Sequence, residues 1–105
     1  MISRLWHGWT TRANADAYEN LLRTEILPGL HRVRGFKGAS VLRRDSGAEV
    51  EFVVITQFDS LDAVKQFAGE DYEVAVIEPE ARKLLARFDA RSAHYQTVFT
   101  MACPG

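Results

Sequence analysis

The chain has 105 residues and a mass of 11.8 kDa, which is the size of a single domain. Hydrophobic residues (47%) and charged residues (26%) occur in the proportion of a folded protein, too apolar for a disordered one. Thirteen basic against fourteen acidic side chains give a formal net charge of -1, which argues against a nucleic-acid partner. We expect one domain over residues 1–100 and a short tail over residues 101–105.

The single cysteine, Cys103, lies beside Pro104, where it can form neither an internal disulfide nor a zinc site. This favours a reducing, cytoplasmic setting. The first residues lack the apolar run of a signal peptide, and no stretch approaches the roughly 20 apolar residues of a membrane span. We therefore expect no membrane partner.

The first quarter of the sequence predicts a strand and a helix. Residues 2–9 are rich in β-forming residues, and residues 14–27 repeat apolar side chains with the period of an amphipathic helix. Either Thr11 or Asn14 can cap the start of that helix. The pair Pro28-Gly29 is expected to end it.

A β-hairpin is predicted next. Residues 36–44 and 50–58 form its arms, and residues 45–48 form its turn. The second arm holds four consecutive apolar residues, Phe52 to Ile55, so we expect it to lie centrally in a sheet and to be covered on both faces.

The second half predicts a helix, a broken helical crossover and a last strand. Asp59-Ser60 is a helix-capping signal for a short helix from Leu61 that Gly69 ends. Pro79 favours a new helix start, and an apolar stripe continues from it towards Phe88. Residues 90–99 carry the β-forming side chains of a final strand.

The order β-α-β-β-α-β predicts the ferredoxin-like α+β fold, with a four-stranded antiparallel sheet and helices on one face. The apolar strands would leave the other face of the sheet hydrophobic in a monomer. We therefore expect a homodimer formed through that sheet face.

Three segments, residues 67–75, 79–85 and 92–98, together with the first strand, resemble the antibiotic biosynthesis monooxygenase superfamily. The resemblance covers nearly the whole chain. It implies a dimeric α/β barrel in which each protomer holds a cleft between its sheet and its helices. Fold transfers across such a superfamily better than chemistry does.

The resemblance implies a cofactor-independent monooxygenase that acts on a small aromatic or polyketide-like substrate in the cleft. The alternatives are a non-catalytic ligand-binding or stress-related barrel and a small-molecule isomerase on the same fold. Haem-degrading members carry an asparagine on the first strand and a tryptophan and a histidine near the second helix. Here the only tryptophans are Trp6 and Trp9, both on the first strand. We therefore expect no haem and no other cofactor.

A cofactor-free oxygenase needs a base that turns a phenol into its electron-rich anion, and histidine is the natural base near neutral pH. We expect His94 as the base, with His7 near the same end of the sheet if the first and last strands pair. Tyr72 is expected to arch over the cleft and bind a substrate oxygen. The alternative for both histidines is a packed side chain that bonds a backbone carbonyl, and for Tyr72 it is a structural anchor of its loop.

Five further residues are candidates for substrate binding: Trp6, Trp9, Phe67, Arg91 and Tyr95. Trp6 and Trp9 are three apart on one strand, so at most one of them lines a given pocket. Tyr95 must likewise point away from its neighbour His94. Quinone-forming members place a tyrosine, a tryptophan, an asparagine and an arginine around their phenol, and of these residue types Tyr72, Trp6 and Arg91 are available here.

No metal site is expected. Glu70, Asp71 and Glu73 lie close together, but without a histidine at ligand spacing they are typical of a solvated acidic turn. No phosphate-binding loop or dinucleotide fingerprint occurs, so nucleotide cofactors are not implied.

Overall fold

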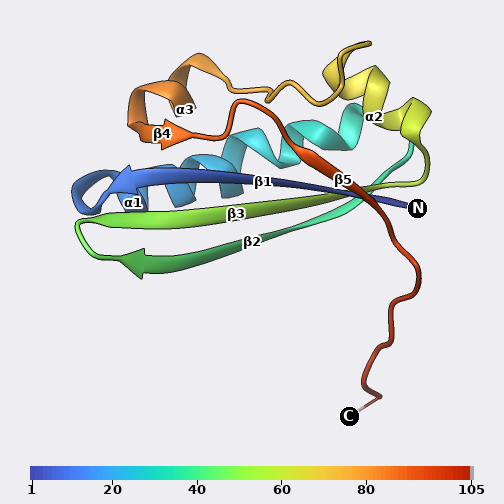
Figure 1. Cartoon of the computed structure of the whole chain (residues 1–105), viewed down its shortest axis with the longest axis horizontal. Coiled ribbons are helices and arrows are strands. Elements are labelled where there is room, and N and C mark those ends of the chain that lie inside the picture. Colours follow the sequence, from blue (N-terminus) through green and yellow to red (C-terminus); the bar gives the residue numbers. More distant parts are fainter. Residues whose placement is uncertain (105) are drawn as a thin grey trace.

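A computed structural model describes residues 1–104 of the chain, and Gly105, the last residue of the expected tail, lies outside it (Figure 1). In chain order the elements are β1 (Ile2–Thr11), α1 (Arg12–Leu21), a π-helical turn η1 (Leu22–Ile26), a 3-10 helix η2 (Pro28–Arg32), β2 (Phe36–Ser46), β3 (Glu49–Phe58), α2 (Leu61–Ala68), α3 (Pro79–Leu84), β4 (Leu85–Phe88) and β5 (Ala93–Gln96).

The strands form one antiparallel sheet in the order β2-β3-β1-β4, and β5 pairs with the other half of β1. β4 lies against residues 8–10 of β1, whereas β5 lies against residues 2–5. The fourth position of the predicted sheet is thus occupied by two short strands in succession. The ferredoxin-like α+β fold is confirmed, with a fifth strand that the sequence pattern did not separate.

The predicted helical stripe towards Phe88 is wrong beyond Leu84. α3 ends there, and residues 85–88 extend as β4 to pair with β1, with Phe88 opposite Gly8. By pairing with the edge of β1, residues 85–88 form hydrogen bonds for their backbone groups as a helix would. This pairing outweighs the helical spacing of their apolar side chains.

The first helical segment is longer than predicted. Thr11 caps α1, its hydroxyl accepting a hydrogen bond from the Asn14 amide at 3.2 Å. Pro28 does not end the segment, because proline fits the first turn of a helix and here begins η2, which runs to Arg32.

The hairpin and the second helix are confirmed. β2 and β3 pair along their lengths, and Gly47, at φ +69°, occupies the left-handed conformation that their tight turn requires. Ser60 caps α2 through the Ala63 amide at 3.2 Å, and Gly69 follows its end at φ +90°.

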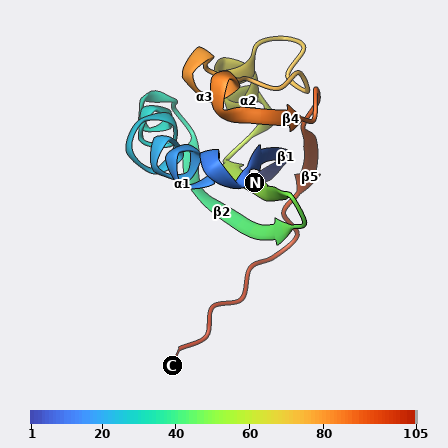
Figure 2. The same cartoon turned by 90° about the vertical axis from the view of Figure 1, so that its left-hand side faces the viewer.

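All helices lie on one side of the sheet (Figure 2). Two separate groups of buried side chains join the layers: one centres on Tyr18 and Phe52, and the other on Phe58 and Val64. β3 is central, as predicted, but only its even-numbered residues face the helices. Val53 and Ile55 face the open side and are partly exposed, so the expected cover on both faces is absent in this chain by itself.

After β5 the chain runs away from the body (Figures 1 and 2). Thr97 still bonds to the start of β1, its amide donating to the Met1 carbonyl at 2.9 Å. Beyond it, Val98, Phe99 and Met101 are exposed. None of the helices in residues 1–104 has the length and hydrophobicity that a membrane-spanning helix needs.

Candidate functional site

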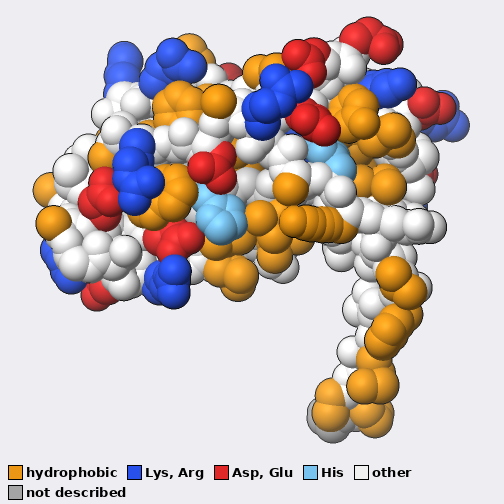
Figure 3. All heavy atoms as spheres, in the orientation of Figure 1, with side chains coloured by type: hydrophobic (Ala, Val, Ile, Leu, Met, Phe, Trp, Pro, Cys, Tyr) orange, Lys and Arg blue, Asp and Glu red, His pale blue; other side chains and the backbone are white. Residues whose placement is uncertain are grey.

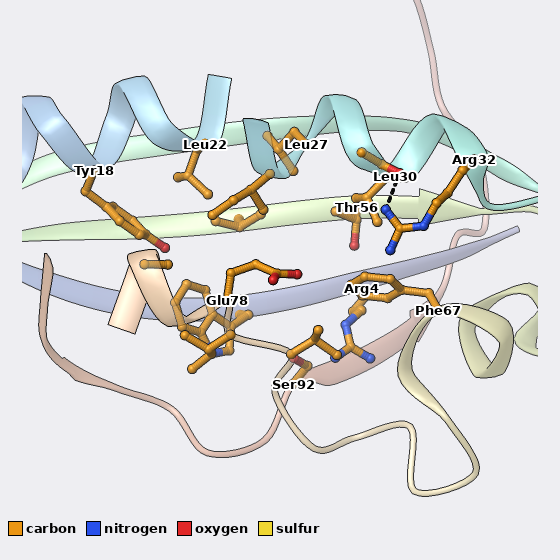
Figure 4. A pocket seen from close by; sticks show the side chains of 17 residues that line it. Arg4, Tyr18, Leu22, Leu27, Leu30, Arg32, Thr56, Phe67, Glu78 and Ser92 are labelled. Atoms are coloured by element: carbon orange, nitrogen blue, oxygen red, sulfur yellow. Dashed lines mark hydrogen bonds between the residues drawn. The ribbon is translucent and has the colours of Figure 1, made fainter. Parts of the chain in front are cut away.

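A cavity of about 90 Å³ lies between the sheet and the helices (Figure 4). It separates the two core groups: Tyr18 and Leu22 of the first lie along one part of it, and Phe67, which packs on the second, lies at another. Exposed Arg32 and Glu78 also line it, so the cavity opens to the surface there. Its volume is below the roughly 300 Å³ at which pockets for drug-sized ligands begin, so a compound with one ring is the size to test.

A polar row crosses the inner face of the sheet at this cavity. Thr56 on β3, Arg4 on β1 and His94 on β5 are register partners across three adjacent strands. The neighbouring inner pairs along β1 and β3 are apolar, Ile2 with Phe58 and Trp6 with Val54. The cavity therefore lies where a polar row separates apolar pairs of the inner face.

Arg4 is the most unusual side chain of the site, because it is only 4% exposed and yet forms no ion pair with a carboxylate of the described residues. Its Nη1 donates to the Tyr72 carbonyl and to His94 Nε2, the latter at 3.0 Å, and its Nη2 donates to the Val74 carbonyl at 3.2 Å. The guanidinium also lies 5.5 Å from the centre of the Phe67 ring. Burial lowers the pKa of Arg4 to about 10, so it stays charged at neutral pH.

His94 lies behind Arg4 and is not among the residues that line the cavity. Because the guanidinium can only donate, His94 Nε2 must accept, and the neutral ring carries its proton on Nδ1. That Nδ1 is buried and has no hydrogen-bond partner in the described part of the chain. Burial and the charge of Arg4 lower the pKa of His94, which favours this neutral form.

Tyr72 packs edge-on against His94, with ring centres 5.0 Å apart. Its carbonyl, rather than its hydroxyl, contacts Arg4. The fold thus brings Tyr72 and His94 together, but both reach the cavity through Arg4.

Of the five expected substrate-binding residues, Trp6 and Phe67 line the cavity. Trp6 lies over Gly8, where a Cβ atom would come within 2.5 Å of the indole. Its Nε1 donates to the Asp89 carbonyl at 2.8 Å, which fixes the ring. Gly8 therefore provides the space in which Trp6 lies.

His7, Trp9 and Tyr95 lie away from the cavity, on the open face of the sheet, because alternation along a strand turns them there. His7 Nδ1 lies 3.2 Å from a carboxylate oxygen of Glu51. Trp9 lies under the Arg87 guanidinium, 3.9 Å from it. His7 and His94 do not share a pocket, because residue 7 faces opposite to residue 4, the register partner of His94.

Arg91 also lies outside the cavity. It is exposed and forms ion pairs with Asp71 at 2.8 Å and with Glu73 at 3.3 Å. One arginine thus offsets part of the negative charge of the acidic turn. Across residues 1–104, no group of three or more histidine, cysteine, aspartate or glutamate residues is arranged to hold a metal ion.

Five polar residues of the cavity were not predicted from the sequence: Arg4, Arg32, Thr56, Glu78 and Ser92. Arg4 carried a usable signal, since it stands two positions before Trp6 and therefore on the same face of the strand. Tyr18 belongs to the apolar face of the helix predicted over residues 14–27, a pattern that does not indicate a site. Figure 4 shows its hydroxyl directed at the cavity, and burial raises its pKa, so it remains a hydrogen-bond donor.

A wider hollow of about 340 Å³ lies between η1 and the edge strand β2. Its charged rim residues, Glu19 and Arg23, already pair with each other at 3.1 Å, and both are on the surface side of α1 and η1. It holds no buried ionisable side chain among the described residues, so the smaller cavity is the better candidate site.

The antibiotic biosynthesis monooxygenase family model matches residues 9–79. The chain belongs to this family. No curated protein matches the sequence significantly. Family membership agrees with the fold.

Solved structures share the fold. A candidate antibiotic biosynthesis monooxygenase from Bacillus cereus has a TM-score of 0.69 at 17% identity, over 100% of this chain and 98% of that one. MhuD, a heme-degrader from Mycobacterium tuberculosis with two hemes bound, has a TM-score of 0.62 at 16% identity, over 97% and 100%. SnoaB, a cofactor-independent oxygenase from Streptomyces nogalater, has a TM-score of 0.59 at 15% identity, over 99% and 98%. At these identities the likeness establishes the fold alone.

The cavity residues do not fit haem. Among the described residues that line the cavity there is no histidine, cysteine or methionine to ligate iron. His94 Nε2 is occupied by Arg4. Tyr18 is present, but burial raises its pKa and so disfavours the tyrosinate that iron would require.

Proposed function

We propose that this family member is a cofactor-independent monooxygenase that oxidises a small phenolic aromatic compound to a quinone. One observation carries the proposal: a chain of this family has a cavity in which two aromatic walls, Trp6 and Phe67, meet a buried cation, Arg4. Aromatic walls bind a flat ring, and a cation in an apolar surrounding stabilises the phenolate that reacts with oxygen.

The reaction balances without a cofactor because the substrate is the reductant. A phenolate passes electrons to dioxygen, and a carbon–oxygen bond forms at the ring carbon opposite the phenolic oxygen. The peroxide regains the proton that the phenol gave up, and the hydroperoxide then loses water as the carbon–hydrogen bond at that ring carbon and the oxygen–oxygen bond break, which leaves the quinone. Each phenol and each dioxygen thus give one quinone and one water.

We propose positioning roles for His94 and Tyr72, in place of the base and direct-binding roles expected from sequence. The Nε2 lone pair of His94, which a base would use, accepts from Arg4. The Tyr72 carbonyl holds the same guanidinium. Both residues keep Arg4 aimed at the cavity, and Glu78 is the carboxylate among the lining residues that can take the phenolic proton.

The test is oxygen uptake by the purified protein with a panel of single-ring phenols, with quinone formation followed by absorbance. We expect Trp6→Ala to lower turnover at least tenfold, because the ring wall is lost. Trp9→Ala is the matched control on the opposite face of β1 and should keep wild-type turnover. Equal losses in both variants, or no oxygen uptake with any ring compound that binds, would contradict the proposal.

A second candidate is an isomerase that moves a proton in a small lactone or enol. Glu78 favours it, since a carboxylate in the cavity can abstract a proton without oxygen. Product formed under nitrogen at the rate seen in air, and lost in Glu78→Gln, would identify this activity. Binding without either reaction would instead indicate a ligand-binding protein.

We propose further that the chain forms a homodimer through the open face of the sheet. Leu42 and Tyr95 on this face are about half exposed (52% and 50%), and Figure 3 shows hydrophobic side chains gathered near the middle of the view. A second copy would cover them and complete a barrel. We expect light scattering to give twice the chain mass for the wild type and the chain mass for Leu42→Glu.

A cytoplasmic location is part of the same proposal. Cys103 is a free and exposed thiol, which is best kept reduced in that compartment. The test is to express the chain with a fluorescent tag in a bacterium and to locate the fluorescence. We expect it in the cytoplasm, and fluorescence outside the inner membrane would contradict the proposal.

A further inference from the structure

We propose that the cavity binds its ligand as a carboxylate, held side-on by Arg4. The inference rests on the proposed function only in using the same cavity, and it specifies the charge and the functional group of the ligand.

Arg4 has more hydrogen-bond donors than its three bonds use. A guanidinium has five N–H groups. Two on Nη1 and one on Nη2 are used by the Tyr72 carbonyl, His94 and the Val74 carbonyl. The Nε hydrogen and one Nη2 hydrogen have no partner in residues 1–104, and these two nitrogens form the edge that binds a carboxylate through two parallel bonds.

The positive charge of Arg4 has no counter-ion among the groups that hold it. All three groups that hold Arg4 are neutral, since two are carbonyls and the third is a histidine whose pKa is lowered. A buried cation without a counter-ion is costly, and proteins ordinarily pair it with an acid. An anionic ligand would supply the missing negative charge.

A threonine and a serine line the same cavity as Arg4. Thr56, the cross-strand partner of Arg4, and Ser92 are both buried and line the cavity, and neither hydroxyl has a hydrogen-bond partner among the described residues. They can donate to the second lone pairs of a carboxylate. Figure 4 shows Arg4, Phe67 and Ser92 together at one end of the cavity, with Tyr18 towards the other.

The apolar part of the ligand follows from the remaining walls. Trp6, Leu22, Leu27 and Ile77 line the cavity beyond Arg4, and its volume is about 90 Å³. These dimensions and walls fit a single ring. The ligand class is therefore a monocyclic aromatic carboxylic acid.

Glu78 is an acid that lines the same cavity without pairing to Arg4. At the mouth, which Arg32 also lines, the charge of Glu78 opposes that of Arg32 and repels an entering carboxylate. Removing that charge should strengthen binding, whereas removing the charge of Arg4 should weaken it.

The test is calorimetric titration of the full chain with sodium benzoate and with benzamide, its neutral counterpart of equal shape, at neutral pH. We expect benzoate to bind at least tenfold more tightly than benzamide, as charge-assisted hydrogen bonds to a buried cation provide. Arg4→Gln should lose at least tenfold for benzoate and little for benzamide. Arg4→Lys, which keeps the charge and loses the two-pronged edge, should fall between them.

Two further variants make the result specific. Arg44→Gln removes an arginine on the open face, already paired with Glu51, and should leave benzoate binding unchanged. Glu78→Gln should strengthen it two- to threefold. Circular dichroism establishes that each variant folds. Equal affinity for the two ligands, no binding of benzoate, or unchanged binding in a folded Arg4→Gln would overturn the proposal, and none of these outcomes depends on oxygen uptake.

Discussion

Two arginine–histidine pairs on opposite faces of the same sheet have opposite electrostatic character. On the open face, Arg44 and His7 share the carboxylate of Glu51, at 2.6 Å and 3.2 Å. On the helix-covered face, Arg4 and His94 share no carboxylate of the described residues and bond to each other. The first pair is internally neutralised, and the second retains a positive charge beside a cavity.

The difference shows that residue type alone does not mark a site. Glu51 lowers the charge of its cluster, and in return Arg44 lowers the pKa of Glu51. Arg4 is surrounded by groups that bond it without cancelling its charge. A functional arginine is therefore recognised by its missing partner rather than by its histidine neighbour.

The largest expected difference is in stability, between a substitution in the core of the helix-covered face and one on the open face. Phe52 is fully buried against Tyr18, with ring centres 4.9 Å apart, so Phe52→Ala should cost about 3–5 kcal/mol. Leu42→Ala on the open face should cost under about 1 kcal/mol in dilute protein. Urea unfolding measures both, and Phe52→Leu serves if the alanine variant does not fold. Equal losses would contradict the assignment of faces.

A smaller effect should follow from the space under Trp6. Gly8→Ala puts a Cβ atom against the indole and should cost about 1–3 kcal/mol. Gly38→Ala is the control, since an added methyl group there would meet no atom within 4 Å, and it should change stability by less than about 0.5 kcal/mol. Tryptophan fluorescence should shift only in Gly8→Ala.

The two arginine–histidine pairs should make stability depend on pH over different pH ranges. Burial, followed by Arg4, lowers the pKa of His94 in the folded chain, while Glu73 acts weakly in the opposite direction. Below about pH 6.5 the unfolded chain therefore binds a proton that the folded chain resists, and stability falls as the pH decreases. His94→Gln should make the free energy of unfolding less dependent on pH between about 7 and 5. An unchanged slope would contradict the buried neutral assignment.

Glu51 should affect stability at lower pH than His94 does. Its hydrogen bond from Arg44, and secondarily the charges of Arg44 and His7, lower its pKa. The stability that it contributes is complete above the usual glutamate pKa of about 4.3 and is lost as the pH falls through the lowered value. Glu51→Gln should cost under about 1 kcal/mol at neutral pH and nothing in strong acid. A larger loss in acid than at neutral pH would reverse the expected sign.

Much of the fold was predictable from local patterns. β-Forming residues identified β1, and a turn between two β-rich arms identified the hairpin. Ser60 identified the start of α2, and Thr11 was one of two candidate caps for the first helix. The order of these elements indicated the ferredoxin-like arrangement. β4 was not predictable, because residues 85–88 continue a helical period and extend only through pairing with β1. Non-local pairing leaves no local signature.

The site was less predictable than the fold. Alternation correctly separated Trp6 from Trp9 and His94 from Tyr95, since it needs only the position along a strand. It could not show that Arg4 lies between His94 and the cavity, because that depends on the register of β1 with β5. The catalytic roles expected of individual residues therefore remain predictions, and Arg4 is the residue through which they are now connected.

The most direct test of the central claim is the NMR signal of the Arg4 Nε–H group, assigned by its absence in Arg4→Gln. If the free edge of this uncompensated arginine receives a carboxylate, adding benzoate should move the Nε proton downfield and slow its exchange with water, whereas benzamide should not. A signal that stays in place while benzoate binds would show that the anion lies elsewhere and that Arg4 has a structural role only.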